Sequence, residues 1–196
     1  IGLAGGVNVL TAQYFGSGNM ENVKYAIANS IYVTAGAGIL MSVISVCFAP
    51  LILSWMQVPE QNFSDALTYM RIVCGAMLIT AFYNTISQIL RGLGDAATPL
   101  YYVIGASVIN VVLDLVFVAV FHWGVAGAAW ATVIAQFFAT AGSAVTAWRK
   151  IPLFRLKGKH LRIQGRIIKY ICRMGIPLAV QNAMNSFAGV IMQGVV

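Results

Sequence analysis

The chain has 196 residues, of which 60% are hydrophobic and only 9% are charged. Soluble domains carry about 25% charged residues, and disordered chains combine low hydrophobicity with high charge, so this composition excludes both classes. Together with a mean hydropathy of +0.83, it indicates an integral membrane protein that crosses the bilayer several times.

The net charge is +7, from twelve Lys and Arg residues against five acidic residues, and nine of the twelve bases lie between Arg149 and Arg173. One short basic stretch between apolar segments is typical of a cytoplasmic loop, so we expect no nucleic-acid partner. The three cysteines lie in apolar context without metal-ligand spacing, which is typical of buried small side chains; they are Cys47, Cys74 and Cys172.

Long apolar segments predict membrane-spanning helices, because a helix needs about 20 residues to cross a hydrocarbon core of about 30 Å. None of these segments shows the alternation of a strand. The first segment is too short to span and the last one is interrupted, so we expect the chain to be an internal part of a longer protein. In chain order the segments are 1–15, 25–55, 66–90, 99–121, 125–148 and a last one that begins near Tyr170.

The loops between these segments predict the orientation in the membrane, because cytoplasmic loops are rich in Lys and Arg. The loops on one side contain Lys24, Arg91 and the basic stretch, whereas the loops on the other side contain no base. The shortest loop predicts that the two helices it joins are antiparallel neighbours. The predicted cytoplasmic loops are 16–24, 91–98 and 149–169, and the predicted outer loops are 56–65 and 122–124.

Asp114 is the only acidic residue inside a complete predicted span. It lies eight residues before His122, which places it about 12 Å below the outer boundary at 1.5 Å per residue, close to the midplane. A charged group at this depth costs several kcal/mol on insertion scales and usually marks an ion or proton path. Asp114 is therefore the leading candidate for a functional residue.

Polar residues on two helix faces could join Asp114. Asn110 lies four residues earlier and shares its helix face. Reflecting the hairpin about its short turn puts Asp114 level with Thr132 and Asn110 level with Gln136, with Ala128 on the same face as Thr132. A carboxylate, an amide and a hydroxyl at one depth suit Na⁺, and a carboxyl group in apolar surroundings suits H⁺. Taken alone, Thr132 and Gln136 are also explained by hydrogen bonds between helices.

The preceding span adds two polar side chains. Asn84 could reach a similar depth, whereas Tyr69 lies nearer the outer interface, where an aromatic belt is the ordinary explanation. The sequence contains no glycine-rich phosphate loop, and its two histidines, His122 and His160, have no Cys or acid at metal-ligand spacing. We therefore expect neither an enzyme nor a cofactor other than a coupling ion.

The loop at 90–99 has the sequence LRGLGDAATP. It resembles the R-x-L-G-D-x-x-T-P loop of multidrug and toxic compound extrusion (MATE) transporters, and of the prokaryotic DinF-like branch in particular. The resemblance continues, in the order of the family, over nearly the whole chain, with AQYFGSG at 12–18, NVVLD at 110–114, GVAGAAWAT at 124–132 and GIP at 175–177.

The resemblance implies an all-α, polytopic helix bundle in which two six-helix lobes are related by an axis along the membrane normal. This chain would supply helices two to six of the N-terminal lobe, the first of them truncated, and the start of helix seven. The implied domains are the N-terminal bundle at 1–148, a basic cytoplasmic linker at 149–169 and the first helix of the C-terminal bundle at 170–196.

The resemblance also implies a site for the coupling cation in the N-terminal lobe. The family site needs a further Asp on the first helix, which this chain does not contain, so the site would be incomplete here. The implied ligands are Asp114, Asn110, Thr132 and the backbone carbonyl of Ala128, the first three being the side chains that could hold Na⁺, while Tyr69, Asn84 and Gln136 would line the cavity.

These observations predict a secondary active transporter of the inner (plasma) membrane, monomeric when full length and surrounded by membrane lipid. It would export amphipathic or cationic organic compounds by antiport against Na⁺ or H⁺. A lipid-linked oligosaccharide flippase of the same superfamily is an alternative, but it would be expected to line its cavity with bases, which are nearly absent at membrane depth. A structural membrane subunit is a further alternative, in which the polar residues only lock helices together.

Overall fold

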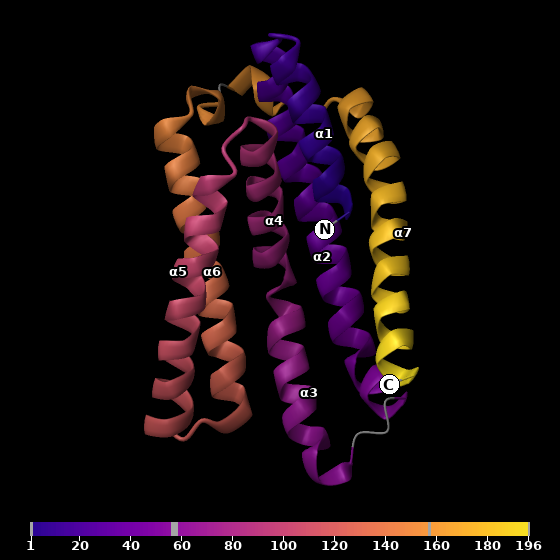
Figure 1. Cartoon of the computed structure of the whole chain (residues 1–196), viewed down its shortest axis with the longest axis vertical. Helices are drawn as coiled ribbons and strands as arrows, with labels where there is room; N and C mark the ends of the chain where they lie inside the picture. Colours follow the sequence, from indigo (N-terminus) through magenta and orange to yellow (C-terminus); the bar gives the residue numbers. More distant parts are fainter. Residues whose placement is uncertain (1, 56–58, 157, 196) are drawn as a thin grey trace. The chain divides into compact units, whose positions relative to one another are not determined.

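The computed structural model describes residues 2–55, 59–156 and 158–195. Throughout these ranges the regular structure is helical, and they contain no strand (Figure 1). The predicted all-α class is thus confirmed. In chain order the helices are α1 (Gly2–Gly16), α2 (Met20–Trp55), α3 (Glu60–Gly75), α4 (Met77–Gly92), α5 (Ala97–Asp114), the π-helix η1 (Leu115–Val120), α6 (Gly124–Lys150), the short 3₁₀ helices η2 (Pro152–Phe154) and η3 (Gly158–Leu161), and α7 (Gly165–Val195).

Within the described residues, three helical segments are each long and apolar enough to cross a membrane, namely α2, α5 together with η1, and α6. The helices α3 and α4 meet the same criteria only as a pair, and they are bent by 43° at the break between them. The four predicted spans therefore all correspond to helices of the structure. The chain is a multi-pass membrane protein, as its composition predicts.

The bend between α3 and α4 is held by a hydroxyl group from α2. A bend leaves backbone carbonyls without their helical partners, and inside a membrane these groups must be satisfied by the protein. Ser42 Oγ donates to the carbonyl oxygens of Cys74 and Gly75, at 2.8 and 3.2 Å. The span predicted at 66–90 is therefore a bent pair of helices, and the sequence does not reveal the bend because this hydrogen-bond partner comes from a different helix.

The chain divides into two compact units, and α2, α4 and α6 each contribute residues to both. Unit 1 includes α1, α7 and the connection between α6 and α7, whereas unit 2 includes α3, α5 and most of α6. Unit 1 comprises Ile1–Thr34, Asn84–Asp95 and Ala147–Val196, and unit 2 comprises Ala35–Tyr83 and Ala96–Thr146.

In unit 1, α1 and α7 pack against each other. The contact is close because Gly6 has no side chain, and a Cβ atom there would lie 2.5 Å from the carbonyl oxygen of Ile171. The helix α7 begins at Gly165, before the predicted start near Tyr170, because Ile167 and Ile171 are buried in this core one helical turn apart. The core joins apolar side chains of α1, α2, α4 and α7, namely Val7, Leu10, Val23, Ala26, Ile27, Ile89, Ile167 and Ile171.

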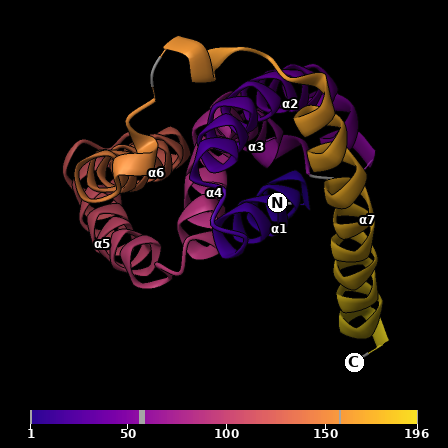
Figure 2. The ribbon, with the colours of Figure 1, turned by 90° about the horizontal axis from the view of Figure 1, so that it is seen from above.

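The connection from α6 to α7 is hydrogen-bonded to α2. Asn29, fully buried in α2, accepts a hydrogen bond from the Gln164 N–H at 2.8 Å and donates to the Arg162 carbonyl at 3.4 Å. The Tyr32 hydroxyl donates to the Leu161 carbonyl at 3.0 Å. Figure 2 shows this connection leading from the end of α6 to the start of α7. These contacts fix the path by which the chain enters α7.

In unit 2, α5 and α6 form an antiparallel hairpin, as their short connection predicts, and they lie side by side in both views (Figures 1 and 2). The hydroxyls of Tyr102 in α5 and Thr146 in α6 are hydrogen-bonded at 2.6 Å. At the turn, the rings of Phe117, Phe121 and Trp123 pack together with centroids 5.1 to 6.2 Å apart. The hairpin therefore holds the predicted cation ligands and Gln136 on two neighbouring helices, whereas Tyr69 and Asn84 lie on α3 and α4.

Candidate functional site

The hairpin brings three of the predicted cation ligands together. Asn110 Nδ2 donates to Thr132 Oγ1 at 3.4 Å, which is a long hydrogen bond between α5 and α6. The Thr132 hydroxyl donates in turn to the backbone carbonyl of Ala128 at 3.0 Å. Because that hydroxyl proton is committed to its own helix, the Thr132 oxygen is left to act as an acceptor toward α5.

A cavity of about 130 Å³ lies between α5 and α6. Asn110, Thr132 and Gln136 line it, together with Ser107, which precedes Asn110 by three residues on the same helix face. Sequence reasoning missed Ser107, although its spacing from Asn110 is the signal that could have found it. The volume corresponds to about four water molecules of about 30 Å³ each, enough for a small ion and some water. The remaining lining is apolar and consists of Val103, Ala106, Ala135 and Ala139.

Asp114 lies one helical turn beyond Asn110 on α5 and is half-buried. Its Oδ1 atom is buried and has no hydrogen-bond partner among the described residues, and the same is true of Oε1 of Gln136. A buried polar atom without a partner costs about 1–3 kcal/mol, and more if it is charged. Asp114 does not line the cavity, but it lies one turn from Asn110, which does, and a carboxylate oxygen in this state is suited to a small cation. The residues present therefore fit the implied coupling ion.

The register of the hairpin differs from the prediction by about one helical turn. The reflection about the turn put Asp114 level with Thr132, but the structure pairs Thr132 with Asn110 instead. The π-helix η1 contributes to this difference, because its last turn is wide and the Phe121 N–H bonds to the Val116 carbonyl five residues earlier, at 3.0 Å. Such wide turns advance less per residue than an α-helix, so Asp114 lies nearer the turn than the predicted ~12 Å.

Two further predicted residues, Tyr69 and Asn84, do not line the cavity between α5 and α6. Tyr69 is 38% exposed on α3, which fits the aromatic belt that is its ordinary explanation. Asn84 is half-buried on α4 and belongs to unit 1, whereas Asn110 and Thr132 belong to unit 2. Their part in the site stays a prediction.

Comparison with known sequences decides the family. The model of the family MatE matches residues 1–116, which is more than half of the chain. The chain belongs to the MatE family. MATE proteins are transporters, so the expectation that this chain is not an enzyme is confirmed. The matched residues include Asn110 and Asp114.

The curated relatives carry names that agree with this assignment. The chain is 27% identical to the probable multidrug resistance protein YoeA of Bacillus subtilis, over 96% of this chain and 42% of that protein. It is 32% identical to the probable multidrug resistance protein YpnP of the same organism, over 69% of this chain and 31% of that protein. The chain therefore spans less than half the length of these relatives.

Solved structures share the fold. An outward-facing multidrug resistance MATE transporter of the MOP superfamily matches 99% of this chain and 43% of its own, with a TM-score of 0.89 and 24% identity. An inward-facing structure of such a transporter matches 90% of this chain and 40% of its own, with a TM-score of 0.82 and 24% identity. At this identity the likeness shows the fold alone. The covered share of the matched chains is consistent with the prediction that this chain forms part of one lobe.

Proposed function

We propose that the full-length protein is a multidrug efflux transporter of the inner (plasma) membrane, which acts as a monomer and exports amphipathic, often cationic, organic compounds. Export would be driven by antiport against Na⁺ or H⁺. The single observation that carries the coupling role is the buried Oδ1 of Asp114, which has no hydrogen-bond partner in the described part of the chain and lies one turn from the Asn110–Thr132 pair. Membership in the MATE family and the names of the curated relatives support the transport role.

The residues of the hairpin would share the work of ion binding. Asp114 would supply the negative charge, and the Thr132 hydroxyl, held by the Ala128 carbonyl, would supply a neutral oxygen. Asn110 would position the Thr132 side chain across the hairpin. The positive charge of the bound ion would balance the negative charge of the Asp114 carboxylate. Coupling requires that the ion binds one facing of the transporter better than the other, and that the exported compound has the opposite preference.

The test is export of a fluorescent organic cation from proteoliposomes that contain the full-length protein, under an imposed Na⁺ or H⁺ gradient. Asp114→Asn keeps the size of the side chain but removes the charge, so we expect gradient-driven export to fall at least tenfold. Asp65→Asn is the matched control, because Asp65 is an exposed acid on α3. Export by Asp114→Asn at the wild-type rate would refute the coupling role and favour a purely structural role for Asp114.

A further inference from the structure

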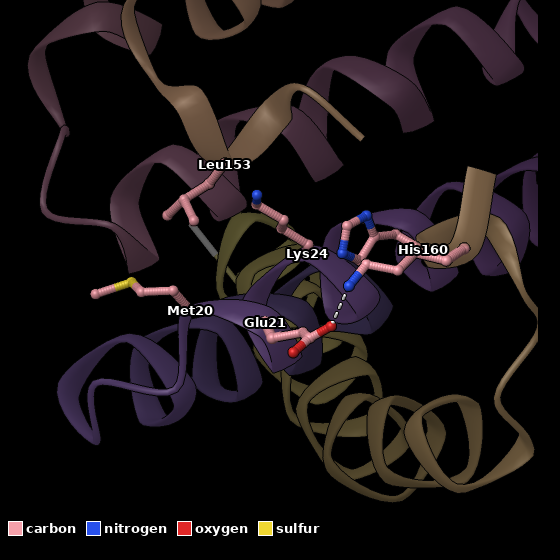
Figure 3. Close-up of a pocket in the computed structure, with 6 residues that line it drawn as sticks. Met20, Glu21, Lys24, Leu153 and His160 are labelled. Atoms are coloured by element: carbon pink, nitrogen blue, oxygen red, sulfur yellow. Dashed lines mark hydrogen bonds and ion pairs between the residues drawn. The ribbon is translucent and has the colours of Figure 1, made fainter. Parts of the chain in front are cut away.

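A larger cavity, of about 280 Å³, lies where the connection between α6 and α7 meets the first turn of α2 (Figure 3). It lies within unit 1, and none of its lining residues lines the cavity between α5 and α6. The lining combines charged, aromatic and apolar side chains, namely Met20, Glu21 and Lys24 from α2 and Leu153, Lys159 and His160 from the connection.

The walls of this cavity are held by specific contacts. Lys159 Nζ forms an ion pair with Glu21 Oε1 at 2.7 Å, which ties η3 to the start of α2. His160 is only 2% exposed and packs edge-on against the ring of Tyr25, with centroids 5.2 Å apart. The cavity is therefore formed in advance of any ligand, with a buried polar side chain in its wall.

The charge of the lining favours an anion. Lys24 and Lys159 contribute two ammonium groups against the single carboxylate of Glu21. The hydrogen bond and the charge of Glu21 raise the pKa of Lys159 above its ordinary value, so this ammonium group stays charged at neutral pH. In Figure 3 the Lys24 side chain extends between Leu153 and His160.

The position of the cavity along α2 corresponds to the lipid headgroups. With 36 residues, α2 is about 54 Å long, which exceeds the roughly 40–45 Å of a whole bilayer, so at least one of its ends reaches a membrane surface, and its two charged residues, Glu21 and Lys24, lie at its start. Exposed apolar side chains occur in the cavity lining and in the residues that follow His160 in the chain. They are Met20, which is 42% exposed, Leu161, which is 47% exposed, and Ile163, which is 64% exposed.

We propose that this cavity binds the phosphate headgroup of an anionic membrane lipid. Lys24 and Lys159 would face the phosphate, and Met20 and Leu153 would lie against the upper part of an acyl chain. Basic pockets at the cytoplasmic ends of membrane helices are suited to such headgroups, and each base near the surface contributes enough to change the affinity about fivefold. The proposal concerns lipid binding and does not depend on which ion or compound is transported.

The test uses purified full-length protein in a non-ionic detergent, with dioctanoyl phosphatidylglycerol added and the melting temperature measured at each concentration. We expect a saturable rise for the wild type. Lys24→Gln should weaken the apparent affinity about fivefold, because one ammonium group is lost. Glu21→Gln should strengthen it by a similar factor, because a carboxylate is removed and Lys159 is released. The control is Lys150→Gln, which removes the same charge from a residue outside the cavity lining and should change the affinity less than about twofold.

Several results would overturn the proposal. Equal shifts with dioctanoyl phosphatidylcholine would mean that the headgroup is not recognised. Equal shifts with inorganic phosphate would mean that the cavity is a site for free anions rather than lipid. If Lys24→Gln and Lys150→Gln weaken the lipid affinity equally, the lipid is attracted by the overall positive charge of the protein and not by this cavity. Because Lys24→Gln leaves the Glu21–Lys159 ion pair in place, the test stands even if Glu21→Gln does not fold. If the lipid proposal fails, the proposed transport function still stands, because the export assay tests it separately.

Discussion

Replacing Thr132 with valine isolates the contribution of one oxygen atom to the candidate cation site. Valine has nearly the shape of threonine, so the cavity of about 130 Å³ keeps its size while the hydroxyl is lost. The bond from Asn110 is long, at 3.4 Å, and the bond to Ala128 is local to α6. The loss of stability should therefore be small, about 0.5–1.5 kcal/mol.

The effect on ion affinity should be larger. If the loss of a ligand oxygen costs about 1–3 kcal/mol, as the loss of a partner does for a buried polar group, the affinity for the cation falls roughly 5- to 150-fold. The assay is the Na⁺ concentration that gives half-maximal export by the full-length protein in proteoliposomes. Thr132→Ser should retain wild-type behaviour, because serine keeps the hydroxyl.

Thr140→Val is the matched control for this experiment. The Thr140 hydroxyl also donates within α6, to the Gln136 carbonyl at 2.8 Å, and to the Ile79 carbonyl at 3.2 Å, but Thr140 does not line the cavity. Its loss should lower stability without changing the dependence on ions. If Thr132→Val keeps the wild-type dependence on both Na⁺ and pH, then Thr132 only joins two helices and is not a ligand.

Two further predictions concern the packing of the helices. Gly6→Val should lower the stability of the full-length protein by about 1–3 kcal/mol in thermal melting, because its Cβ would lie 2.5 Å from the Ile171 carbonyl. The control is Gly36→Ala, which should be neutral or slightly stabilising because no atom lies within 4 Å of the added Cβ. Equal melting temperatures for the two variants would contradict the close contact of α1 and α7. Ser42→Ala should cost about 1–3 kcal/mol because it leaves carbonyls such as that of Cys74 unpaired at the bend, and an unchanged melting temperature would show that the bend does not need this hydroxyl.

Some features of the site follow from local sequence. The turn at 122–124 is too short to allow anything but antiparallel neighbours, so the helices that carry Asn110 and Thr132 must lie beside each other. The importance of Asp114 also follows from the sequence, since a carboxyl group in a long apolar segment is costly wherever its neighbours lie. These arguments need only the length of a turn and the polarity of a segment.

Other features depend on contacts that the sequence does not reveal. The register of the hairpin is shifted in part by η1, whose wide turns accompany the packing of the rings of Phe117, Phe121 and Trp123. The bend at Gly75 depends on a hydroxyl group of Ser42, which lies on another helix. Neither the register nor the bend could be predicted, because both involve contacts between side chains and helices that only the folded structure brings together.

The sequence by itself determined that this chain crosses a membrane several times as helices and that Asp114 is its one acid inside a complete span, because hydrophobicity and segment length act locally. The tertiary structure decided which oxygens meet across the hairpin and that Lys24 and Lys159, far apart in the chain, share one cavity. The physical reason is that hydrogen bonds and ion pairs act over a few ångströms, and only the packing of helices brings distant residues within that range.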